Sequence, residues 1–393
     1  MKRFLFCLLA MALFWSCHPR SEGPKRLIED GIEVVDNGTG VFPSPEGPRS
    51  LSLKEEFRID LEDEALAAVG LTDIATIDAD SKGRVYLFRR GASQGPVVFQ
   101  FDERGRFLKS FCAIGQGPGE VEYPHYLRLS SSDEIPIFSQ GAMAINYYDT
   151  EARFLRKKPV PSSLRFLYHS FKPLANGNFL VQYIPLDAEM RFSTVILGLF
   201  DGDFRKLKDI RENDITESPE AIKNPLSRMT LVGVSGTAFF VNWGESGNDI
   251  AVFDLDGRLV RLIRGSFPAV PVPPEYKKDL LNRIPQVRSF KFIREFLESR
   301  DVFPAFQGFI TDERNRLFVA GFEKDKESGA NICDVFTPDG IRILKGGIGY
   351  QDLVRWIWDM QSFDVVLKND RCYCVHEKPS GFREVVVYSM IWR

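Results

Sequence analysis

The fold is decided by the run IDADSKGRVYL at residues 77–87, followed by VVFQF at 97–101 and DERGRFL at 102–108. Short apolar stretches rich in β-branched and aromatic residues alternate here with polar turns that contain glycine. An aspartate in such a turn accepts hydrogen bonds from the turn's own amides, and a glycine adopts the positive φ that closes it. The run therefore predicts four consecutive strands, with a glycine turn after the first and an Asp-x-x-Gly turn after the third.

The same pair of turns returns along the chain. The Asp-x-x-Gly turn at Asp102 recurs at Asp149, Asp201, Asp254 and Thr337, at successive spacings of 47, 52, 53 and 83 residues. The last spacing contains an insertion of about 30 residues, so the underlying period is about 50. Six units result, with starts near residues 71, 125, 168, 229, 306 and 361. Because a four-stranded unit of this length is typical of a propeller blade, residues 51–393 are predicted to form one all-β, six-bladed β-propeller.

The two ends of this region predict how the ring closes. The last unit holds only three strand-like segments, at residues 361–367, 371–376 and 384–392. A further strand-like segment, Leu51–Ile59, precedes the first unit. We expect it to supply the missing outer strand of the sixth blade, because such closure pairs both chain ends and removes an exposed edge.

Residues 273–304 interrupt the strand pattern with a short helical insertion. The sequence predicts helices over 276–282 and 290–299, separated at Pro285. Apolar residues at i,i+4 give the second helix one apolar stripe. Two interpretations remain: a lid over one face of the propeller, or a decoration packed on the side of blades four and five.

The N-terminus reads as an export signal. Lys2 and Arg3 precede a 12-residue apolar run, which is too short for a membrane span and fits a signal-peptide core. The run ends at Ser16-Cys17, which resembles a bacterial lipobox and implies cleavage before Cys17 and its lipidation. The alternative is a plain secretory signal in which Cys17 is incidental. Residues 1–17 are thus predicted to be removed, and residues 18–50, rich in Pro, Gly and charge, to form a tether. His18, the residue after the cysteine, favours an outer-membrane location. Which leaflet of that membrane holds the anchor is left undecided.

Composition excludes one class of partner. The chain has 51 Lys+Arg and 54 Asp+Glu, a net charge of −3. Nucleic-acid binders need a concentrated basic surface, so we expect no nucleic-acid partner. The hydrophobic fraction of 44% and the charged fraction of 27% are those of a globular protein.

A family resemblance rests on residues 101–108 (FDERGRFL), on 115–120 (GQGPGE) and on Tyr123-Pro124. With these motifs the chain resembles NHL-type propellers, and more closely the six-bladed β-propeller lipoproteins of Bacteroidetes. The resemblance is specific over residues 71–125 and rests on turn positions elsewhere. It implies a propeller on a lipid anchor in the cell envelope. It supplies no activity, because most members of that group have none established.

Candidate ligand-binding residues lie where one blade crosses to the next. The glycine loop could cradle an anion with its amides, although no P-loop lysine follows, and the alternative is a purely structural crossing. Rim aromatics could stack on sugar rings, or could simply pack between blades. The candidates are Gly115, Gly117, Gly119, Glu120, Tyr123, His125, Trp243, Tyr350 and Trp356.

Catalytic and metal-binding signals are weak. The four histidines show no i,i+2 or i,i+4 pairing, and no G-x-S-x-G motif occurs. Aspartates at repeated turn positions, such as Asp80 and Asp312, are more often structural than catalytic. Neither a catalytic residue nor a metal ligand nor a cofactor is therefore predicted. The remaining cysteines are Cys112, Cys333, Cys372 and Cys374. They are either buried free thiols, or Cys333 is bridged to one of the two cysteines in blade six.

Three functions stay open at this point. The first is a non-catalytic module, anchored in the membrane by lipid, that binds an envelope protein, a small molecule or a glycan. The second is a propeller enzyme of the lyase or lactonase kind, with a metal-assisted site at the central channel. The third is a scaffold subunit of a glycan- or peptide-uptake complex.

Overall fold

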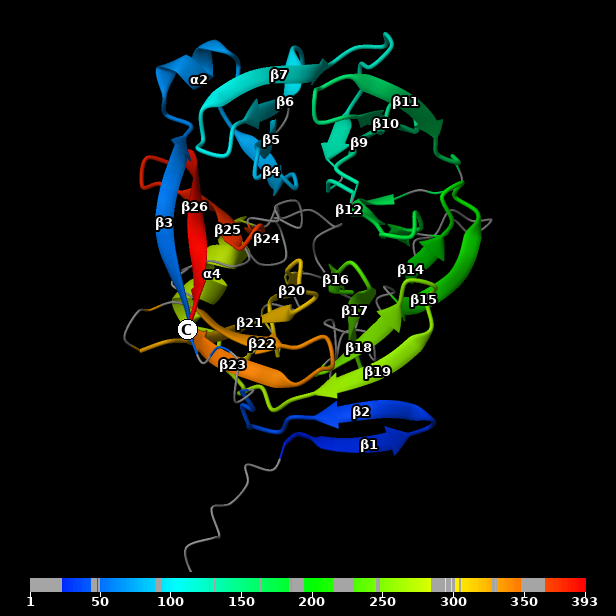
Figure 1. Ribbon diagram of the computed structural model, residues 1–393, viewed down its shortest axis with the longest axis vertical. Coiled ribbons are helices and arrows are strands. Elements are labelled where there is room, and N and C mark those ends of the chain that lie inside the picture. Colours follow the sequence, from blue (N-terminus) through cyan, green and yellow to red (C-terminus); the bar gives the residue numbers. More distant parts are fainter. Residues whose placement is uncertain are drawn as a thin grey trace, which may run out of the picture.

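The computed structural model shows six β-sheets arranged like blades around a central axis (Figure 1). It describes residues 23–393 apart from 44–47, 90–92, 186–193, 215–229, 245–247, 284–293, 295–297, 348–364 and scattered shorter positions. The predicted six-bladed propeller is therefore confirmed. The inner strands of the blades begin at residues 74, 124, 166, 232, 308 and 365, within a few residues of the unit starts expected from the repeats.

The first three blades are four-stranded antiparallel sheets in which the chain runs outward from the axis. Blade one holds β4 (Ile74–Ala79), β5 (Val85–Arg89), β6 (Pro96–Phe101) and β7 (Phe107–Ala113). Blade two holds β8 (Pro124–Tyr126), β9 (Ile135–Ser139), β10 (Ala144–Tyr148) and β11 (Phe154–Pro159). Blade three holds β12 (Phe166–Pro173), β13 (Phe179–Tyr183), β14 (Thr194–Phe200) and β15 (Lys206–Asp214).

The last three blades complete the ring. Blade four holds β16 (Val232–Val234), β17 (Ala238–Trp243), β18 (Asp249–Asp254) and β19 (Leu259–Arg264). Blade five holds β20 (Gly308–Thr311), β21 (Leu317–Lys324), β22 (Asn331–Phe336) and β23 (Arg342–Gly347). Blade six holds β24 (Val365–Lys368), β25 (Arg371–Glu377), β26 (Arg383–Trp392) and, on the outside, β3 (Leu51–Asp60).

Blade six closes the ring in the predicted way. Strand β3 from the N-terminal region pairs antiparallel with β26 at the C-terminus, from Leu51 opposite Trp392 to Asp60 opposite Glu384. The pairing continues one residue further, because Ser50 and Arg393 exchange backbone hydrogen bonds of 2.9 and 3.0 Å. Both ends of the propeller are thereby held in one sheet.

The core consists of six apolar clusters among the described residues, one between each pair of neighbouring blades. Strand β5 shows how one sequence serves two of them. Val85 and Leu87 pack toward blade six, while Tyr86 and Phe88 pack toward blade two. Successive side chains of a strand point to opposite faces of its sheet. Because each blade is covered on both faces, its strands are apolar at almost every position.

The expected tether over residues 18–50 is wrong in part. Residues 25–36 form a hairpin of β1 (Lys25–Glu29) and β2 (Ile32–Asp36), and β2 pairs in parallel with β19. The sheet of blade four therefore has six strands, with the hairpin on its outer edge (Figure 1). The turn holds Asp30 and Gly31 at φ of 49° and 79°, which matches the Asp-Gly turn of tight hairpins. Val34 and Val35 are fully buried, so the contact is part of the fold.

In the part of the chain that the structure describes, two short helices stand outside the blades. Helix α2 (Glu64–Ala68) connects β3 to blade one, and the Asp63 carboxylate caps it by accepting from the Ala65 amide. Helix α4 (Pro274–Arg283) confirms the first helix of the predicted insertion. The expected break at Pro285 and most of the expected helix over 290–299 lie outside the described residues. Among the residues that the structure describes, no helix is long and apolar enough to cross a membrane.

Candidate functional site

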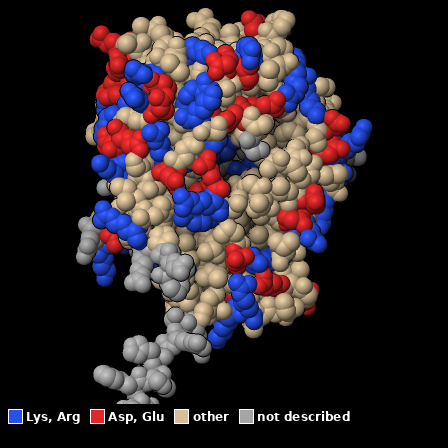
Figure 2. Space-filling view, viewed as in Figure 1, with Lys and Arg blue, Asp and Glu red and all other residues tan. Residues whose placement is uncertain are grey.

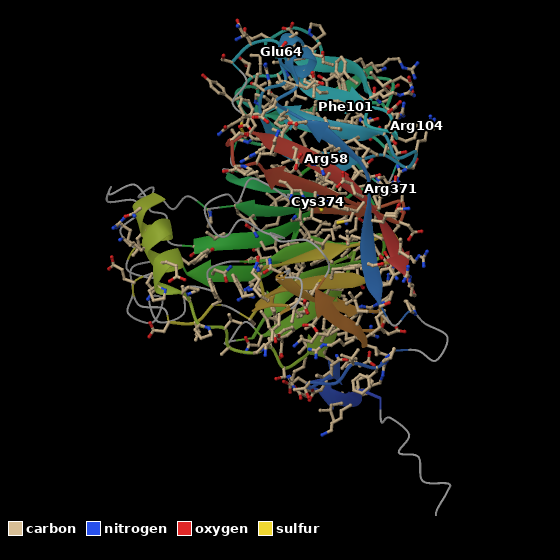
Figure 3. The ribbon with its side chains drawn as sticks, turned by 90° about the vertical axis from the view of Figure 1, so that its left-hand side faces the viewer. Arg58, Glu64, Phe101, Arg104, Arg371 and Cys374 are labelled. Atoms are coloured by element: carbon tan, nitrogen blue, oxygen red, sulfur yellow. The ribbon has the colours of Figure 1, made fainter. Side chains whose placement is uncertain are left out.

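The disc has two faces that differ in their connections. On the turn face lie the tight turns that join the first to the second and the third to the fourth strand of a blade. On the crossing face lie the remaining loops and the segments that lead from one blade to the next. Figure 3 shows the two faces on opposite sides, with Arg104 and Arg371 at turns on one of them and α4 beyond the strand ends on the other. The insertion thus projects from the crossing face.

The turn face is held together by one repeated contact. In blade one the Asp80 carboxylate, fully buried, accepts hydrogen bonds from the amides of Lys82 and Arg84 at 2.9 and 3.0 Å. The Arg84 guanidinium then donates from Nε to Asp80 Oδ2 at 2.6 Å, and the Tyr86 hydroxyl donates to the same oxygen at 3.0 Å.

The pattern Asp-x-x-x-Arg recurs with the same side-chain pairing at Asp102–Arg106, Asp149–Arg153, Asp254–Arg258 and Asp312–Arg316. The repeated aspartates therefore stabilise turns, as their positions in the sequence indicated. The arginine four residues after each of them was a visible signal that the sequence analysis missed.

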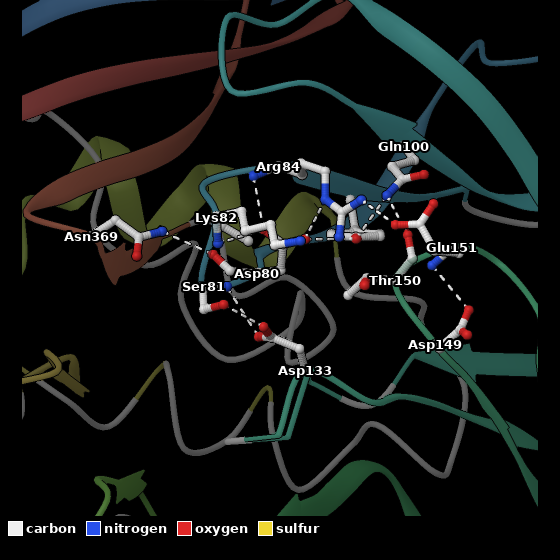
Figure 4. Close-up of polar contacts among 12 residues, drawn as sticks. Asp80, Ser81, Lys82, Arg84, Gln100, Asp133, Asp149, Thr150, Glu151 and Asn369 are labelled. Atoms are coloured by element: carbon white, nitrogen blue, oxygen red, sulfur yellow. Dashed lines mark hydrogen bonds and ion pairs between the residues drawn. The ribbon is translucent and has the colours of Figure 1, made fainter.

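Polar contacts between neighbouring blades form a complete ring that involves these turns. Figure 4 shows blades six, one and two, where Asn369 Nδ2 donates to Asp80 O at 2.9 Å and the Ser81 amide donates to Asp133 at 3.0 Å. Equivalent contacts complete the circle at Lys158–Asp203, Asn176–Leu255, Gly236–Asn315 and Arg314–Asp370. Polar groups of the turns on this face are thus used to hold blade to blade.

The predicted glycine loop lies on the crossing face, between blades one and two. The Glu120 carboxylate folds back into the loop and accepts from the Gly117 amide at 2.8 Å. A Cβ at Gly115 would lie 2.0 Å from Glu120 Oε2, so glycine leaves the room that this carboxylate fills. Gly119 has φ of 76° and lies against Phe154 of blade two. A carboxylate already occupies the place where a bound anion would sit, which favours the structural crossing over the phosphate-binding interpretation.

Tyr123 and His125 follow the loop and lie on the rim of this face. Tyr123 is 76% exposed and has φ of 47°, an unusual conformation for a residue with a side chain. Its carbonyl accepts from the Gln140 amide at 3.2 Å. His125 Nε2 is 3.1 Å from Gln140 Oε1, and burial lowers the pKa of the imidazole. The structure brings these residues together as one polar patch around an exposed aromatic ring.

The other predicted rim aromatics have different outcomes. Trp243, at the end of β17, is half-buried, and its ring packs edge-on against Phe253 at 5.7 Å between centroids. The Arg211 guanidinium from blade three lies over the Trp243 ring, 5.8 Å from its centroid. These contacts favour inter-blade packing for Trp243. Tyr350 and Trp356 lie outside the described residues.

The four cysteines of the propeller are buried, and none of them is in a disulfide. Burial raises the pKa of the Cys112 thiol to about 12 and also raises that of Cys333. Cys372 and Cys374 lie on the same side of β25, and their sulfur atoms are 3.3 Å apart. Within the described part of the chain, no group of three or more His, Cys, Asp or Glu side chains is arranged to hold a metal ion.

The fold and its closure define a six-bladed β-propeller with neighbours among Bacteroides proteins. A protein from Bacteroides fragilis that is thought to be exported matches with a TM-score of 0.54 and 13% identity, over 89% of this chain and 98% of that one. A DUF4221 family member from Bacteroides vulgatus matches with a TM-score of 0.42 and 12% identity, over 88% of this chain and 100% of that one. A virginiamycin B lyase from Staphylococcus aureus matches with a TM-score of 0.39 and 10% identity, over 87% of this chain and 100% of that one. No family model and no curated protein matches the sequence. At these identities the likeness to the first protein shows a shared fold alone, and the two lower scores support no argument.

Proposed function

We propose that this chain is a lipid-anchored propeller of the bacterial cell envelope, related to the NHL-like propeller lipoproteins, and that it binds a glycan or another small polar ligand without catalysis. The binding surface is the rim patch, which consists of Gln116, Glu122, Tyr123, His125 and Gln140 on the crossing face. An outer-membrane location is part of the proposal.

One observation supports the proposed binding: Tyr123, whose ring is exposed, has a strained left-handed backbone conformation. A left-handed backbone at a bulky residue costs about 1–3 kcal/mol and persists only where the surroundings impose it, commonly at binding sites. The surroundings are rigid here, because the Gly141 amide donates to Glu122 O at 3.1 Å and the Gln140 amide donates to Tyr123 O. An aromatic ring fixed on a protein surface offers a flat face at little entropic cost.

The polar side chains around this ring suit a ligand with many hydroxyl groups. Gln116 Nε2 donates to Glu122 Oε1 at 2.7 Å, which ties Gln116 to the residue before Tyr123, and both side chains have further hydrogen-bonding capacity. His125 and Gln140 extend the same patch. A few oriented polar groups next to an apolar ring are the usual composition of a small-molecule site. Because the turn face uses polar groups of its turns between blades, the crossing face is the better candidate for recognition.

The position of the hairpin supports the anchoring half. Cys17 precedes Lys25, the first residue of β1, by eight residues. An extended chain covers at most about 3.5 Å per residue, so the disc edge would stay within roughly 28 Å of the lipidated cysteine. A lipid-modified Cys17 would therefore hold blade four close to the membrane.

Anchoring is tested in a bacterial host by labelling with an alkyne fatty acid and by fractionating the membranes. We expect label and outer-membrane sedimentation for the natural chain and neither for Cys17→Ser. A labelled Cys17→Ser variant, or an unlabelled natural chain, would contradict the anchor.

Binding is tested by screening the mature chain on an oligosaccharide and peptide array and comparing Tyr123→Ala with Phe382→Ala. Phe382 is also an exposed aromatic on a crossing-face loop, 43% exposed, but belongs to blade six. We expect the Tyr123 change to weaken a bound oligosaccharide at least tenfold and the Phe382 change to leave it within twofold. Equal effects of the two changes would contradict the rim patch.

A further inference from the structure

The free outer edge of blade four differs from the outer edges of the other blades. In each blade the third strand and the outermost blade strand pair with a register shift, next to Phe101, Tyr148, Phe200, Phe253, Phe336 and Tyr388. Such a β-bulge twists an outer strand and hinders its regular pairing with another chain. In blade four the hairpin covers the bulged strand β19, so that β1 becomes the edge of the sheet.

Strand β1 is a regular and accessible edge. Its pairing with β2 runs from Lys25 opposite Asp36 to Glu29 opposite Ile32 with consecutive partners throughout, and the parallel pairing of β2 with β19 is equally regular. All five residues of β1 are exposed, and the hairpin lies outside the ring of blades (Figure 1). The edge of blade four is therefore the outer edge best suited to accept a further strand.

The hairpin geometry decides which backbone groups of β1 face outward. The turn has two residues, Asp30 and Gly31, and the residue pair that flanks such a turn is hydrogen-bonded. Hydrogen-bonded pairs alternate with non-hydrogen-bonded pairs along an antiparallel ladder. The amides and carbonyls of Arg26 and Ile28 therefore face away from the sheet, while those of the other three residues of β1 face β2.

The side chains of β1 fit an antiparallel copy of the same strand. Its sequence, KRLIE, has a lysine at the start, a leucine in the centre and a glutamate at the end. If two copies pair antiparallel about Leu27, the two leucines face each other. Arg26 then lies opposite Ile28 of the second copy, so their outward-facing backbone groups can bond. Lys25 lies opposite Glu29. Because Ile28 and Leu27 are 72% and 45% exposed, this pairing would also bury apolar surface.

Charge complementarity favours this register. Figure 2 shows basic and acidic side chains gathered on the hairpin at the lower end of the molecule. Arg264 donates to both carboxylate oxygens of Glu29, at 2.9 and 3.1 Å, and also pairs with Asp249 at 3.2 Å. Two carboxylates thus share one guanidinium, and Lys25 of a second copy would add a further positive charge beside them. A register in which Arg26 lies opposite itself would bring like charges together, which is unfavourable.

We propose that β1 is the interface of a symmetric dimer of this chain, in which the β1 strands of two copies pair antiparallel about Leu27 and join the two blade-four sheets into one. A two-fold axis makes the interface self-complementary, as the order of charges along β1 requires. The contact spans five residues per copy, so we expect a reversible dimer with a dissociation constant in the micromolar range. The dimer requires neither the lipid anchor nor the rim patch, so it goes beyond the function proposed above.

The first test is sedimentation velocity of a chain that begins at residue 18, at concentrations from about 1 to 300 µM. We expect a monomer–dimer equilibrium. Leu27→Lys puts like charges face to face at the two-fold axis and should weaken the dimer at least tenfold. The control is Leu155→Lys on β11, because Leu155 is also 45% exposed but lies on a bulged outer edge. This control should dimerise within twofold of the natural chain. A monomer at every concentration, or equal weakening by the two changes, would overturn the proposal.

Disulfide cross-linking tests the register and does not depend on a variant that disrupts the contact. Residues that face each other in a non-hydrogen-bonded pair have Cα atoms about 4.5 Å apart, a separation that a disulfide can span. With diamide as the oxidant, Leu27→Cys should form a covalent dimer at least tenfold faster than Ile28→Cys, because only the first change places two thiols opposite each other. The four natural cysteines of the propeller are buried and should not compete. A faster cross-link at position 28, or none in either variant, would overturn the pairing about Leu27.

Discussion

Gly105 lies directly against the ring of Phe57, across the seam where the propeller closes. A Cβ built on Gly105 would be 2.5 Å from Phe57 Cδ2 and 2.8 Å from Cε2. Gly105 is the glycine that ends the Asp102 turn in blade one. Phe57 lies in β3, the N-terminal strand that completes blade six. The turn that marks the repeat in the sequence is therefore also a contact between the first blade and the closing strand.

Replacing Gly105 by alanine should destabilise the propeller more than the same change at Gly177. Both glycines have a positive φ, at 80° and 85°, so both changes cost backbone strain of about 1 kcal/mol. A Cβ at Gly177 would have no other atom within 4 Å, whereas a Cβ at Gly105 would meet the Phe57 ring. We expect Gly105→Ala to lower the free energy of unfolding by about 2–3 kcal/mol, measured by urea denaturation. Equal losses for the two variants would show that the seam yields without cost.

The buried aspartate in the first turn of blade one should matter more than the aspartate in the turn between the last two strands of blade three. Asp80 is fully buried and bonds two amides, an arginine and a tyrosine hydroxyl. Asp201 accepts from the amides of Asp203 and Arg205, both at 2.8 Å, in a more exposed turn. Asp80→Ala leaves Arg84 without its buried carboxylate, and breaking such a pair costs about 3–5 kcal/mol. Asp201→Ala should cost about 1 kcal/mol. Thermal unfolding of the two variants checks this order, and a larger loss at Asp201 would contradict it.

The blades could be predicted because each unit carries its own turn chemistry and apolar strands. The closing strand followed from counting three strands in the last unit. The hairpin over residues 25–36 was missed, although Asp30-Gly31 between two five-residue strands is a hairpin signal. The Pro- and Gly-rich residues around it suggested a tether instead, and its pairing partner β19 lies more than 200 residues away.

The sites could be predicted only where they are local in the chain. The glycine loop, Tyr123 and His125 lie within a short segment, so their placement on one rim followed from the blade boundaries. Trp243 was ambiguous in the sequence, since its partner Arg211 comes from the neighbouring blade.

Asn37 should prove essential for holding the N-terminal segment to the disc. It is buried, its Oδ1 accepts from the Arg342 amide at 2.8 Å, and its Nδ2 donates to Gly340 O at 2.9 Å. Asn37→Ala leaves these two buried backbone groups unsatisfied, so we expect a loss of about 2–4 kcal/mol. The control Asn248→Ala changes an exposed asparagine and should cost less than about 0.5 kcal/mol. Urea denaturation compares them, and a loss at Asn37 no larger than that at Asn248 would mean that the segment does not stabilise the disc.

The thiols should resist alkylation in the folded protein. Cys112, Cys333, Cys372 and Cys374 are buried, and the raised thiol pKa of Cys112 and Cys333 keeps the reactive thiolate rare in both. In a chain that begins at residue 18, iodoacetamide should modify none of the four within minutes at pH 8. All four should react in denaturant without reductant. A missing thiol in denaturant would instead reveal a disulfide, and rapid native labelling would contradict their burial.

The lowered pKa of Lys172 should make stability depend on pH in a window that a single variant isolates. The ordinary lysine value is 10.5, and the folded value is about 7. Between these values the unfolded chain binds the proton more tightly than the folded chain, so the free energy of unfolding rises as the pH rises from about 7 to 10.5. Lys172→Met lacks this contribution, while other titrating groups cancel in the comparison. We therefore expect the natural chain to gain up to about 1 kcal/mol per pH unit relative to Lys172→Met across this window. Urea denaturation at pH 7, 8, 9 and 10, without multivalent anions, measures the difference. A difference that stays flat from pH 7 to 10 would show that Lys172 titrates as an ordinary surface lysine.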